Sequence, residues 1–312
     1  MVGFFCYYCI VNEKTLIVLV GPTGVGKTDL SIQLAEYFAC PIISSDSRQI
    51  YKELKIGSAP PNESQLERVK HYFIGIKSMC DSYNAGQYEL DVMELLEEHF
   101  KKNNVALLVG GSMMYIDAVC KGLDNIPAIS AEIRNKVTFL YENIGLEGVR
   151  AELLKLDPIH YQKVDLNNKQ RVMHALEVCL TIGGPYSEIL RAQHKRRNFN
   201  IIKIGINLPR EQLYKRINSR VDLMIDKGLI EEAKALYPYK QYNSLNTVGY
   251  KEFFEYFEGK CTLDFAIQMV KQDSRRYAKR QLTWFNADKE IQWFSVDQFD
   301  EILDFLKGKL LN

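Results

Sequence analysis

The sequence predicts an α/β protein, in which a P-loop NTPase-like core with a parallel sheet carries an inserted all-helical domain. Strand-like and helix-like segments alternate along most of the chain, and a glycine-rich loop follows the first strand. Between residues 119 and 198 the strand pattern disappears and helical patterns replace it. Because such alternation is typical of parallel sheets covered on both faces, we assign residues 1–118 and 199–312 to the core and residues 119–198 to the insertion.

Short runs rich in apolar and β-branched residues are the expected strands. Helical patterns separate them, for example at Tyr88, Val92, Leu95 and Leu96. From Pro209 onward long helical patterns dominate. The expected strands are residues 16–20, 41–45, 105–109, 201–206 and 291–294, and the expected helices of the insertion are residues 131–142, 146–156 and 168–181.

The composition is that of a soluble globular protein. The chain has 312 residues, of which 46% are hydrophobic and 25% charged, and its formal net charge is +1. Any surface that binds nucleic acid must therefore come from local clusters of basic residues.

The cysteines and the N-terminal stretch bear on location. Seven cysteines, an odd number, favour reduced thiols over a disulfide framework, and the pair Cys6 and Cys9 has no second pair at zinc spacing. Residues 1–11 are apolar but too short to span a bilayer, and they lack a basic segment and a cleavage site. We expect a cytoplasmic protein that binds no membrane, and we expect a monomer.

A phosphate loop is the most specific motif. The loop fits G-x-x-x-x-G-K-[ST], follows the first expected strand and precedes an amphipathic helix over residues 29–38. Its glycines let backbone N–H groups surround a phosphate, Lys27 adds a positive charge, and the Thr28 hydroxyl is placed to ligate Mg²⁺. This predicts a site for a di- or triphosphate, such as that of ATP. The loop residues are Gly21, Pro22, Thr23, Gly24, Val25, Gly26, Lys27 and Thr28.

Two further groups follow expected strands. Asp46 comes at the end of the second strand and should lie beside the phosphate loop, because functional groups gather at the carboxyl ends of parallel strands. The alternative is that Asp46 only caps its own turn. The third expected strand ends in Gly110, Gly111 and Ser112 and not in a carboxylate, which disfavours routine hydrolysis of a nucleoside triphosphate.

Basic residues recur at helical spacing in the last third of the chain. Arg216 and Arg220 share one helix face, which is either a solvated basic face near Asp222 and Asp226 or a pair of lid arginines that reach phosphates. A second block pairs Arg275 with Lys279 and Arg276 with Arg280, and Tyr277, Trp284 and Phe285 interleave with it. Such residues suit phosphate contacts and base stacking, although alone they are a weak signal for nucleic acid.

Taken together, these blocks resemble the tRNA dimethylallyltransferases (tRNA isopentenyltransferases) of the bacterial type, from about residue 15 to residue 294. The blocks occur in the family's order. They are the phosphate loop, Asp46-Ser47-Arg48-Gln49-Ile50-Tyr51, Ile56-Gly57-Ser58, Gly110-Gly111-Ser112, Gln170-Arg171-Val172, Val248-Gly249-Tyr250-Lys251-Glu252, and Ala278-Lys279-Arg280-Gln281-Leu282-Thr283-Trp284.

The resemblance implies the substrates and the roles of the site residues. The donor would be dimethylallyl diphosphate, the acceptor the N6 amine of adenosine 37 in the anticodon stem-loop of tRNA, and the by-product pyrophosphate. Asp46 would take the proton as the new bond forms, while Lys27, Arg220 and Mg²⁺ would neutralise the leaving group. Thr28 would orient the amine or the diphosphate, or ligate the metal.

The resemblance also implies the tRNA contacts, and the chain departs from the family at three points. Ser112 replaces a usual Thr, Ala59 replaces a usual Lys, and His174 replaces a common Arg, which makes a possible phosphate contact weaker and dependent on pH. The implied tRNA-binding residues are Asp46, Ser47, Arg48, Gln49, Ser112, Arg134, Gln170, Arg171, Val172, Met173, His174, Val248, Gly249, Tyr250, Lys251, Arg275, Lys279, Arg280 and Gln281.

Three other functions compete with this one. A P-loop kinase of a small molecule would also use the loop and the lid arginines, but it does not need the basic, aromatic C-terminal third. A prenyltransferase of free adenine nucleotides would share the core, but not the insertion. A tRNA-binding protein without activity would not need Lys27, Thr28 and Asp46 intact.

Overall fold

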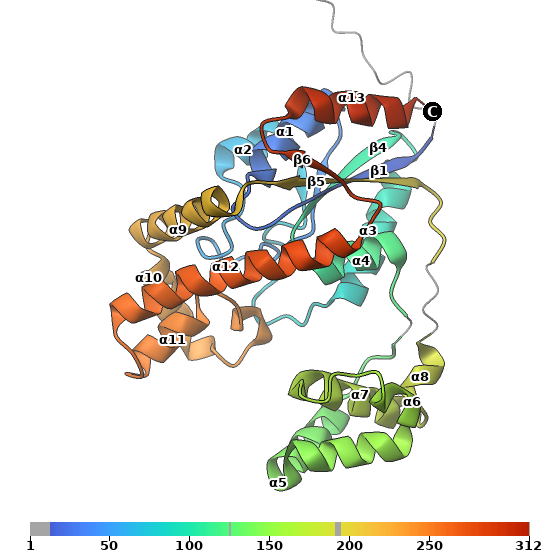
Figure 1. The fold of residues 1–312 in the computed structure, drawn as a ribbon, viewed down its shortest axis with the longest axis vertical. Coiled ribbons are helices and arrows are strands. Elements are labelled where there is room, and N and C mark those ends of the chain that lie inside the picture. The colour runs from blue at the N-terminus through green and yellow to red at the C-terminus, as the bar shows by residue number, and fades with distance from the viewer. Residues whose placement is uncertain (1–12, 125, 191–194, 312) are drawn as a thin grey trace, which may run out of the picture. The chain divides into compact units, whose positions relative to one another are not determined.

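Six parallel strands form the sheet of the core in the computed structural model (Figure 1), which describes residues 13–124, 126–190 and 195–311. The strand order is β3-β2-β4-β1-β5-β6. This confirms the predicted fold class, an α/β core on a parallel sheet. The strands are β1 (Thr15–Val20), β2 (Ile42–Ser44), β3 (His71–Tyr72), β4 (Val105–Gly110), β5 (Asn200–Asn207) and β6 (Gln292–Ser295).

The five expected strands are all present, but one strand was missed. β3 has only two residues, too few to show a hydrophobic pattern, and it pairs with β2 at the edge of the sheet. The strand that ends in Gly110 is consequently the fourth along the chain and not the third. The helix after the phosphate loop begins two residues earlier than predicted, at Lys27.

Alternate side chains of β1 pack into two hydrophobic cores, one on each face of the sheet. Ile17 and Leu19 pack into the core that contains residues of α1 (Lys27–Tyr37) and α13 (Phe299–Leu310). Leu16 and Val18 pack into the core that contains residues of α3 (Ala85–His99) and α4 (Met113–Lys121). Figure 1 shows these two layers above and below the strands, with the short helix α2 (Glu63–Arg68) beside α1.

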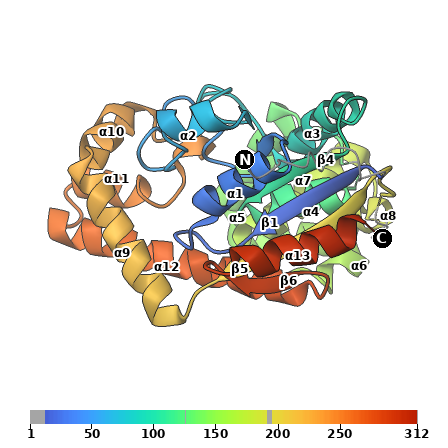
Figure 2. The same ribbon diagram turned by 90° about the horizontal axis from the view of Figure 1, so that it is seen from above.

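A group of helices stands at one end of the sheet in the same unit (Figure 2). Helix α12 is the longest of them, and its buried positions Ala266, Val270 and Phe285 recur at helical spacing. The group consists of α9 (Arg210–Asp226), α10 (Leu229–Leu236), α11 (Lys251–Phe257) and α12 (Leu263–Ala287), with two 3₁₀ turns at Tyr237–Tyr239 and Asn243–Leu245.

The insertion forms a compact unit of its own, from Lys121 to Arg196, whereas we predicted residues 119–198. The range is shorter because α4 continues to Lys121 and because Arg197 belongs to the core. The Arg197 guanidinium donates to the carbonyl oxygens of Ala118 and Val119, at 2.7 and 2.9 Å, and forms an ion pair with Glu89.

The regular secondary structure among the described residues of the insertion is all helical. The helices are α5 (Ala131–Leu156), α6 (Pro158–Tyr161), α7 (Lys169–Ile182) and α8 (Tyr186–Ile189). Gly145 interrupts α5 with a φ of 66°, so its two halves correspond to the two helices expected there. The core of this unit packs Val137, Val149 and Leu153 of α5 against Val172 and Leu176 of α7.

Two further expectations concern the whole chain. No helix in the described ranges is long and apolar enough to cross a membrane. Among the described residues, Cys40, Cys80, Cys179 and Cys261 are free thiols. Residues 1–11, and with them Cys6 and Cys9, lie outside the described residues.

Candidate active site

The phosphate loop curls around the N-terminus of α1. Gly24 and Gly26 have φ values of 78° and 110°, a conformation that residues with a Cβ rarely adopt. The Lys27 ammonium donates to the carbonyl oxygens of Gly21 and Pro22, at 2.8 and 2.9 Å, and so folds back over the loop. Burial, followed by the neighbouring Arg220, lowers the pKa of Lys27 to about 7, although Asp46 acts in the opposite direction. An anion bound in the loop would favour the protonated amine.

Gln281 fixes the phosphate loop through two side-chain hydrogen bonds. Its side-chain amide donates to Gly111 O at 2.9 Å, and its side-chain carbonyl accepts from the Thr23 backbone N–H at 2.8 Å. A Cβ at Gly111 would lie 2.2 Å from Gln281 Nε2, which explains why a glycine stands at this position. Gln281 is only 2% exposed, so the prediction that it contacts tRNA does not fit the structure. Its role is to join α12 to the phosphate loop.

Asp46 caps the turn that follows β2. Its Oδ1 accepts from the backbone N–H groups of Arg48, at 2.8 Å, and Gln49, at 3.3 Å, so the alternative role as a cap is present. Ser112 supports the same turn, because its hydroxyl oxygen accepts from the Ser47 N–H at 2.8 Å. Ser112 is buried, and this burial does not fit its prediction as a tRNA contact.

The side chain of Gln49 also points into the protein. Its carbonyl accepts from the Ser44 hydroxyl, and its amide donates to the backbone carbonyls of Ser58 and Ala59, at 3.3 and 3.0 Å. Gln49 therefore fastens the loop around Ser58 to the turn after β2, and its hydrogen bonds are used within the chain.

Two cavities lie side by side in this unit and share four lining residues, Thr23, Asp46, Arg220 and Tyr277. The phosphate-loop cavity, of about 500 Å³, is lined by Gly24, Gly26, Lys27 and Thr28 among others. The mixed cavity, of about 340 Å³, has an apolar wall and a basic rim. Its wall consists of Ile217, Val221, Met224, Val248 and Val270, and its rim of Arg48, Lys251 and Arg280.

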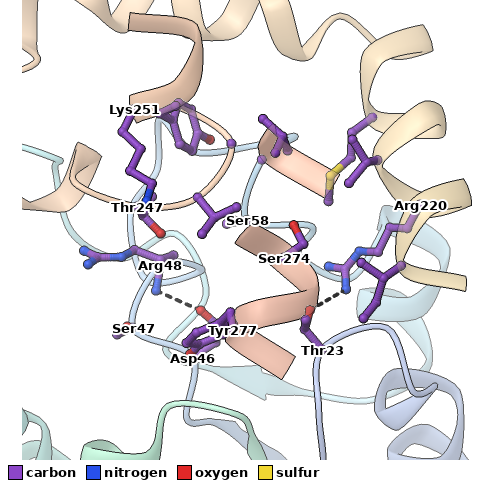
Figure 3. Close-up of a pocket in the computed structure, with 18 of the residues that line it drawn as sticks. Thr23, Asp46, Ser47, Arg48, Ser58, Arg220, Thr247, Lys251, Ser274 and Tyr277 are labelled. Atoms are coloured by element: carbon purple, nitrogen blue, oxygen red, sulfur yellow. Dashed lines mark hydrogen bonds between the residues drawn. The ribbon is translucent and has the colours of Figure 1, made fainter. Parts of the chain in front are cut away.

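Both candidate lid arginines of α9 reach the phosphate loop. Arg220 donates to the Thr23 hydroxyl at 3.1 Å, as Figure 3 shows, and burial lowers its pKa. A Cβ at Gly26 would lie 3.2 Å from Arg216 Nη2, so the exposed Arg216 guanidinium lies against the loop. The alternative of a purely solvated basic face is therefore wrong for Arg220.

Comparison with known proteins adds to this geometry. Residues 49–288 match the family model described as IPP transferase. The chain belongs to the IPP transferase family. It is 54% identical over 300 residues to tRNA dimethylallyltransferase 1 of Bacteroides fragilis, which covers 96% of this chain and 100% of that protein.

Solved structures of family members resemble the fold. The full-length tRNA isopentenylpyrophosphate transferase from Bacillus halodurans has a TM-score of 0.70 and 36% identity, over 96% of this chain and 97% of that chain. A eukaryotic dimethylallyltransferase acting on tRNA has a TM-score of 0.80 and 26% identity, over 95% of this chain and 80% of that chain.

The residues predicted to contact tRNA in the core unit fall into two groups. Lys279 and Arg280 are exposed on α12, and the Arg280 guanidinium lies 5.7 Å from the centre of the Tyr277 ring. Lys251, 45% exposed, forms an ion pair with Asp273 at 2.9 Å. Tyr250, by contrast, is fully buried, which does not fit a surface contact.

Three further predicted residues line the mixed cavity, and a fourth, Arg275, joins two helices that contribute to it. Ser47, Val248 and Gly249 line it, and Figure 3 shows Ser47 beside Asp46. Arg275 donates to Asn218 Oδ1 at 2.6 Å, and this bond joins α12 to α9.

The residues predicted in the helical insertion also divide by exposure. Arg134 on α5 and Gln170 and Arg171 on α7 are exposed, and the His174 side chain is 48% exposed. Val172 is fully buried in the core of this unit, and Met173 packs against that core. The prediction of a contact at Val172 therefore does not fit, because a helix at this position turns one residue in every three or four inward.

Sequence reasoning missed two features of this site. Tyr277 was noted only as an interleaved aromatic residue, yet it lines both cavities, and burial raises the pKa of its hydroxyl to about 12. The apolar wall was missed entirely. Ile217, Val221 and Met224 recur at helical spacing beside Arg216 and Arg220, and that spacing could have predicted an apolar face of the same helix.

Proposed function

We propose that this protein transfers a dimethylallyl group from dimethylallyl diphosphate to the N6 amine of adenosine 37 in tRNA, with release of pyrophosphate. The observation that carries the proposal is the pair of cavities that meet at Asp46, Thr23, Arg220 and Tyr277. One cavity suits a diphosphate and the other suits a flat base with a phosphate backbone beside it. The names of similar proteins, tRNA dimethylallyltransferases, support the same reaction.

The donor's diphosphate fits the phosphate-loop cavity. Loop N–H groups at the start of α1, Lys27, Arg216 and Arg220 converge there. A diphosphate leaves an allylic carbon readily once its charge is neutralised, and fixed positive groups do this with little reorganisation. Arg220, which donates to the Thr23 hydroxyl and lines this cavity, would stabilise the charge that develops on the leaving diphosphate.

Magnesium is the metal that we expect at this site. The described residues hold no cluster of three His, Cys, Asp or Glu side chains that could bind a metal by themselves. In phosphate-loop proteins the Ser or Thr hydroxyl of the loop binds Mg²⁺ together with substrate phosphates, and Thr28, which lines the phosphate-loop cavity, would supply that hydroxyl. When bound, the metal would supply part of the charge neutralisation.

The acceptor side explains the role proposed for Asp46. The N6 lone pair attacks the allylic carbon, the C–O bond electrons leave with pyrophosphate, and the amine loses a proton. A carboxylate is too weak a base to deprotonate the amine beforehand, so Asp46 takes the proton as the C–N bond forms. The cap that Arg48 N and Gln49 N provide holds this carboxylate at the junction of the cavities.

The mixed cavity suits an unstacked nucleotide. Extrusion of a base costs a few kcal/mol and is easiest in a single-stranded loop, which favours an anticodon loop over a helix. The rim residues Arg48, Lys251 and Arg280 suit backbone phosphates, and the apolar wall suits the base and the prenyl chain. Arg134, Gln170, Arg171 and His174 are proposed as contacts of the insertion with the stem.

A labelling experiment tests the proposal. Purified protein is incubated with Mg²⁺, radiolabelled dimethylallyl diphosphate and an anticodon stem-loop that carries adenosines 36 and 37, with a matched stem-loop carrying guanosine 37 as control. We expect label in the first RNA alone. A parallel tube contains AMP, and label there would indicate a nucleotide prenyltransferase. Transfer to neither acceptor would contradict the proposal, and turnover of ATP with a small acceptor would then indicate a kinase.

Location and assembly remain predictions. The seven cysteines, an odd number, favour a reducing compartment such as the cytoplasm. Light scattering at micromolar protein concentration tests the predicted monomer.

A further inference from the structure

We infer that Glu232 is a positioning residue, which fixes the shape of the mixed cavity by tying together two segments that line it. The identity of the ligand in that cavity rests on the function proposed above. Glu232 lies on α10 and does not itself line either cavity. It therefore acts through the residues that it holds.

Three consecutive backbone N–H groups converge on the Glu232 carboxylate. Lys55 N donates to Oε2 at 3.0 Å, Ile56 N to Oε2 at 2.8 Å and to Oε1 at 3.1 Å, and Gly57 N to Oε1 at 3.0 Å. Hydrogen bonds to an ionised acceptor are stronger than those between neutral groups, and adjacent N–H groups form a concave site for an anion. In this chain a side chain of the protein occupies that site.

The same carboxylate also holds the second segment. The Tyr250 hydroxyl donates to Glu232 Oε1 at 2.7 Å, and the Tyr250 ring is fully buried. A Cβ at Gly57 would lie 2.5 Å from the Tyr250 hydroxyl oxygen, so the ring packs directly on the backbone of residue 57. Glu232 is thus the common acceptor for both segments.

Both of these segments line the mixed cavity. Gly57 and Ser58 line it from one segment, and residues 246–251 line it from the other. Figure 3 shows Ser58, Thr247 and Lys251 around the same space. Gln49 fastens the far end of the first segment at Ser58 and Ala59, so Glu232 controls the end that Gln49 does not reach.

The phosphate-loop cavity is lined by the end of the first segment that Gln49 holds, at Ala59, and not by the end that Glu232 holds. Its lining includes neither Gly57 nor Tyr250, and the hydrogen bonds of Glu232 within the described part of the chain include none to the phosphate loop. Loss of the Glu232 carboxylate should therefore weaken use of the RNA acceptor and leave binding of the donor's diphosphate intact.

The test compares the variants Glu232→Gln, Tyr250→Phe and Glu231→Gln. Gln at position 232 turns an amide NH₂ toward backbone N–H donors, and Phe at position 250 removes only the hydroxyl. Glu231 is the exposed neighbour on α10 and serves as the matched control. The readouts are KM for the anticodon stem-loop, kcat, and the Kd for pyrophosphate with Mg²⁺.

For Glu232→Gln we expect KM for the stem-loop to rise at least tenfold, while the Kd for pyrophosphate stays within twofold of wild type. Tyr250→Phe should shift KM in the same direction by a smaller factor, and Glu231→Gln should match wild type. The inference is overturned if KM for the stem-loop does not change, or if the Kd for pyrophosphate rises by the same factor. If Glu232→Gln does not fold, the same criteria are applied to Tyr250→Phe.

The two proposals fail in different ways. Wild-type protein that transfers no label to RNA would contradict the proposed function, whereas only the ratios between variants bear on Glu232. In that case the Glu232 inference is judged on whichever acceptor the wild type does label, by the same ratio of acceptor KM to pyrophosphate Kd.

Discussion

The Gln281 side-chain carbonyl accepts a hydrogen bond from the Thr23 backbone N–H, at 2.8 Å, across a sequence separation of 258 residues. The Thr23 hydroxyl in turn accepts a hydrogen bond from the Arg220 guanidinium. A helix near the C-terminus and a lid arginine therefore meet at one residue of the phosphate loop. The conformation of that loop depends on the packing of α12 as well as on its own glycines.

Substitution of Gln281 by Met should weaken binding of the donor. The variant keeps the length of the side chain but leaves the Thr23 N–H without this acceptor, and loss of a hydrogen bond of this kind costs about 1–3 kcal/mol. Gly111 O loses the amide of Gln281 and keeps its longer hydrogen bond from the Tyr277 hydroxyl, at 3.4 Å. We expect the Kd for pyrophosphate with Mg²⁺ to rise about tenfold or more, measured by calorimetry. Gln268→Met, exposed on the same helix, is the control and should bind as wild type does. Weaker RNA binding with an unchanged Kd for pyrophosphate would restore Gln281 to the tRNA contacts.

Two substitutions at Asp46 separate its capping from its proposed chemistry. Asn retains an oxygen that can accept from Arg48 N and Gln49 N, whereas Ala loses both bonds. We expect Asp46→Asn to lower kcat by about 10² or more with a melting temperature close to wild type, and Asp46→Ala to lower both. Single-turnover rates with saturating stem-loop are the measurement. A rate near wild type for Asp46→Asn would rule Asp46 out as the base.

Much of this site follows from local patterns. The apolar strands and the glycine-rich loop are continuous in sequence, so they predict the sheet and the phosphate loop with bounds close to those observed. The placement of Asp46 beside the loop follows from the rule that parallel strands end at one edge. The position of Arg220 near the phosphates could be proposed because its spacing from Arg216 puts both residues on one helix face.

Other parts depend on contacts between distant segments. Gln281 forms its hydrogen bond with Gly111 across 170 residues of sequence. Nothing in its neighbours Arg280 and Leu282 shows whether its side chain is buried against the phosphate loop or exposed to RNA. Val172 stands in a block of polar residues, and only the packing of α7 on α5 shows that it faces inward. Residue types and spacing do not carry such information, because it arises from tertiary packing.

Charge removal on α12 tests the proposed RNA surface. Lys279 and Arg280 are exposed, and phosphate contacts made by such residues release counterions on binding. We expect Lys279→Ala and Arg280→Ala each to weaken stem-loop binding and to reduce the slope of log K against log salt concentration by about 0.7–0.9. Lys289→Ala, exposed in the turn after α12 and outside both cavities, is the charge-matched control. Equal slopes in all four proteins would leave α12 outside the RNA interface.

The lowered pKa of Lys27 predicts how binding of the diphosphate depends on pH. Burial and Arg220 bring this pKa to about 7 in the empty site, whereas a bound anion favours the protonated amine and raises it. Above pH 7 the empty protein must therefore take up a proton when it binds, so its affinity falls as the pH rises. Below pH 7 Lys27 is already protonated and contributes no pH dependence.

The variant Lys27→Arg isolates this effect from the titration of pyrophosphate itself, because Arg stays charged throughout the range. From pH 7.5 to 8.5 we expect the wild-type Kd for pyrophosphate to rise up to about tenfold more than the Kd of Lys27→Arg, which corresponds to uptake of one proton. Calorimetry in two buffers of different ionisation enthalpy counts that proton directly. Parallel pH profiles of the two proteins, with no difference in proton uptake, would show that Lys27 is fully protonated in the empty site.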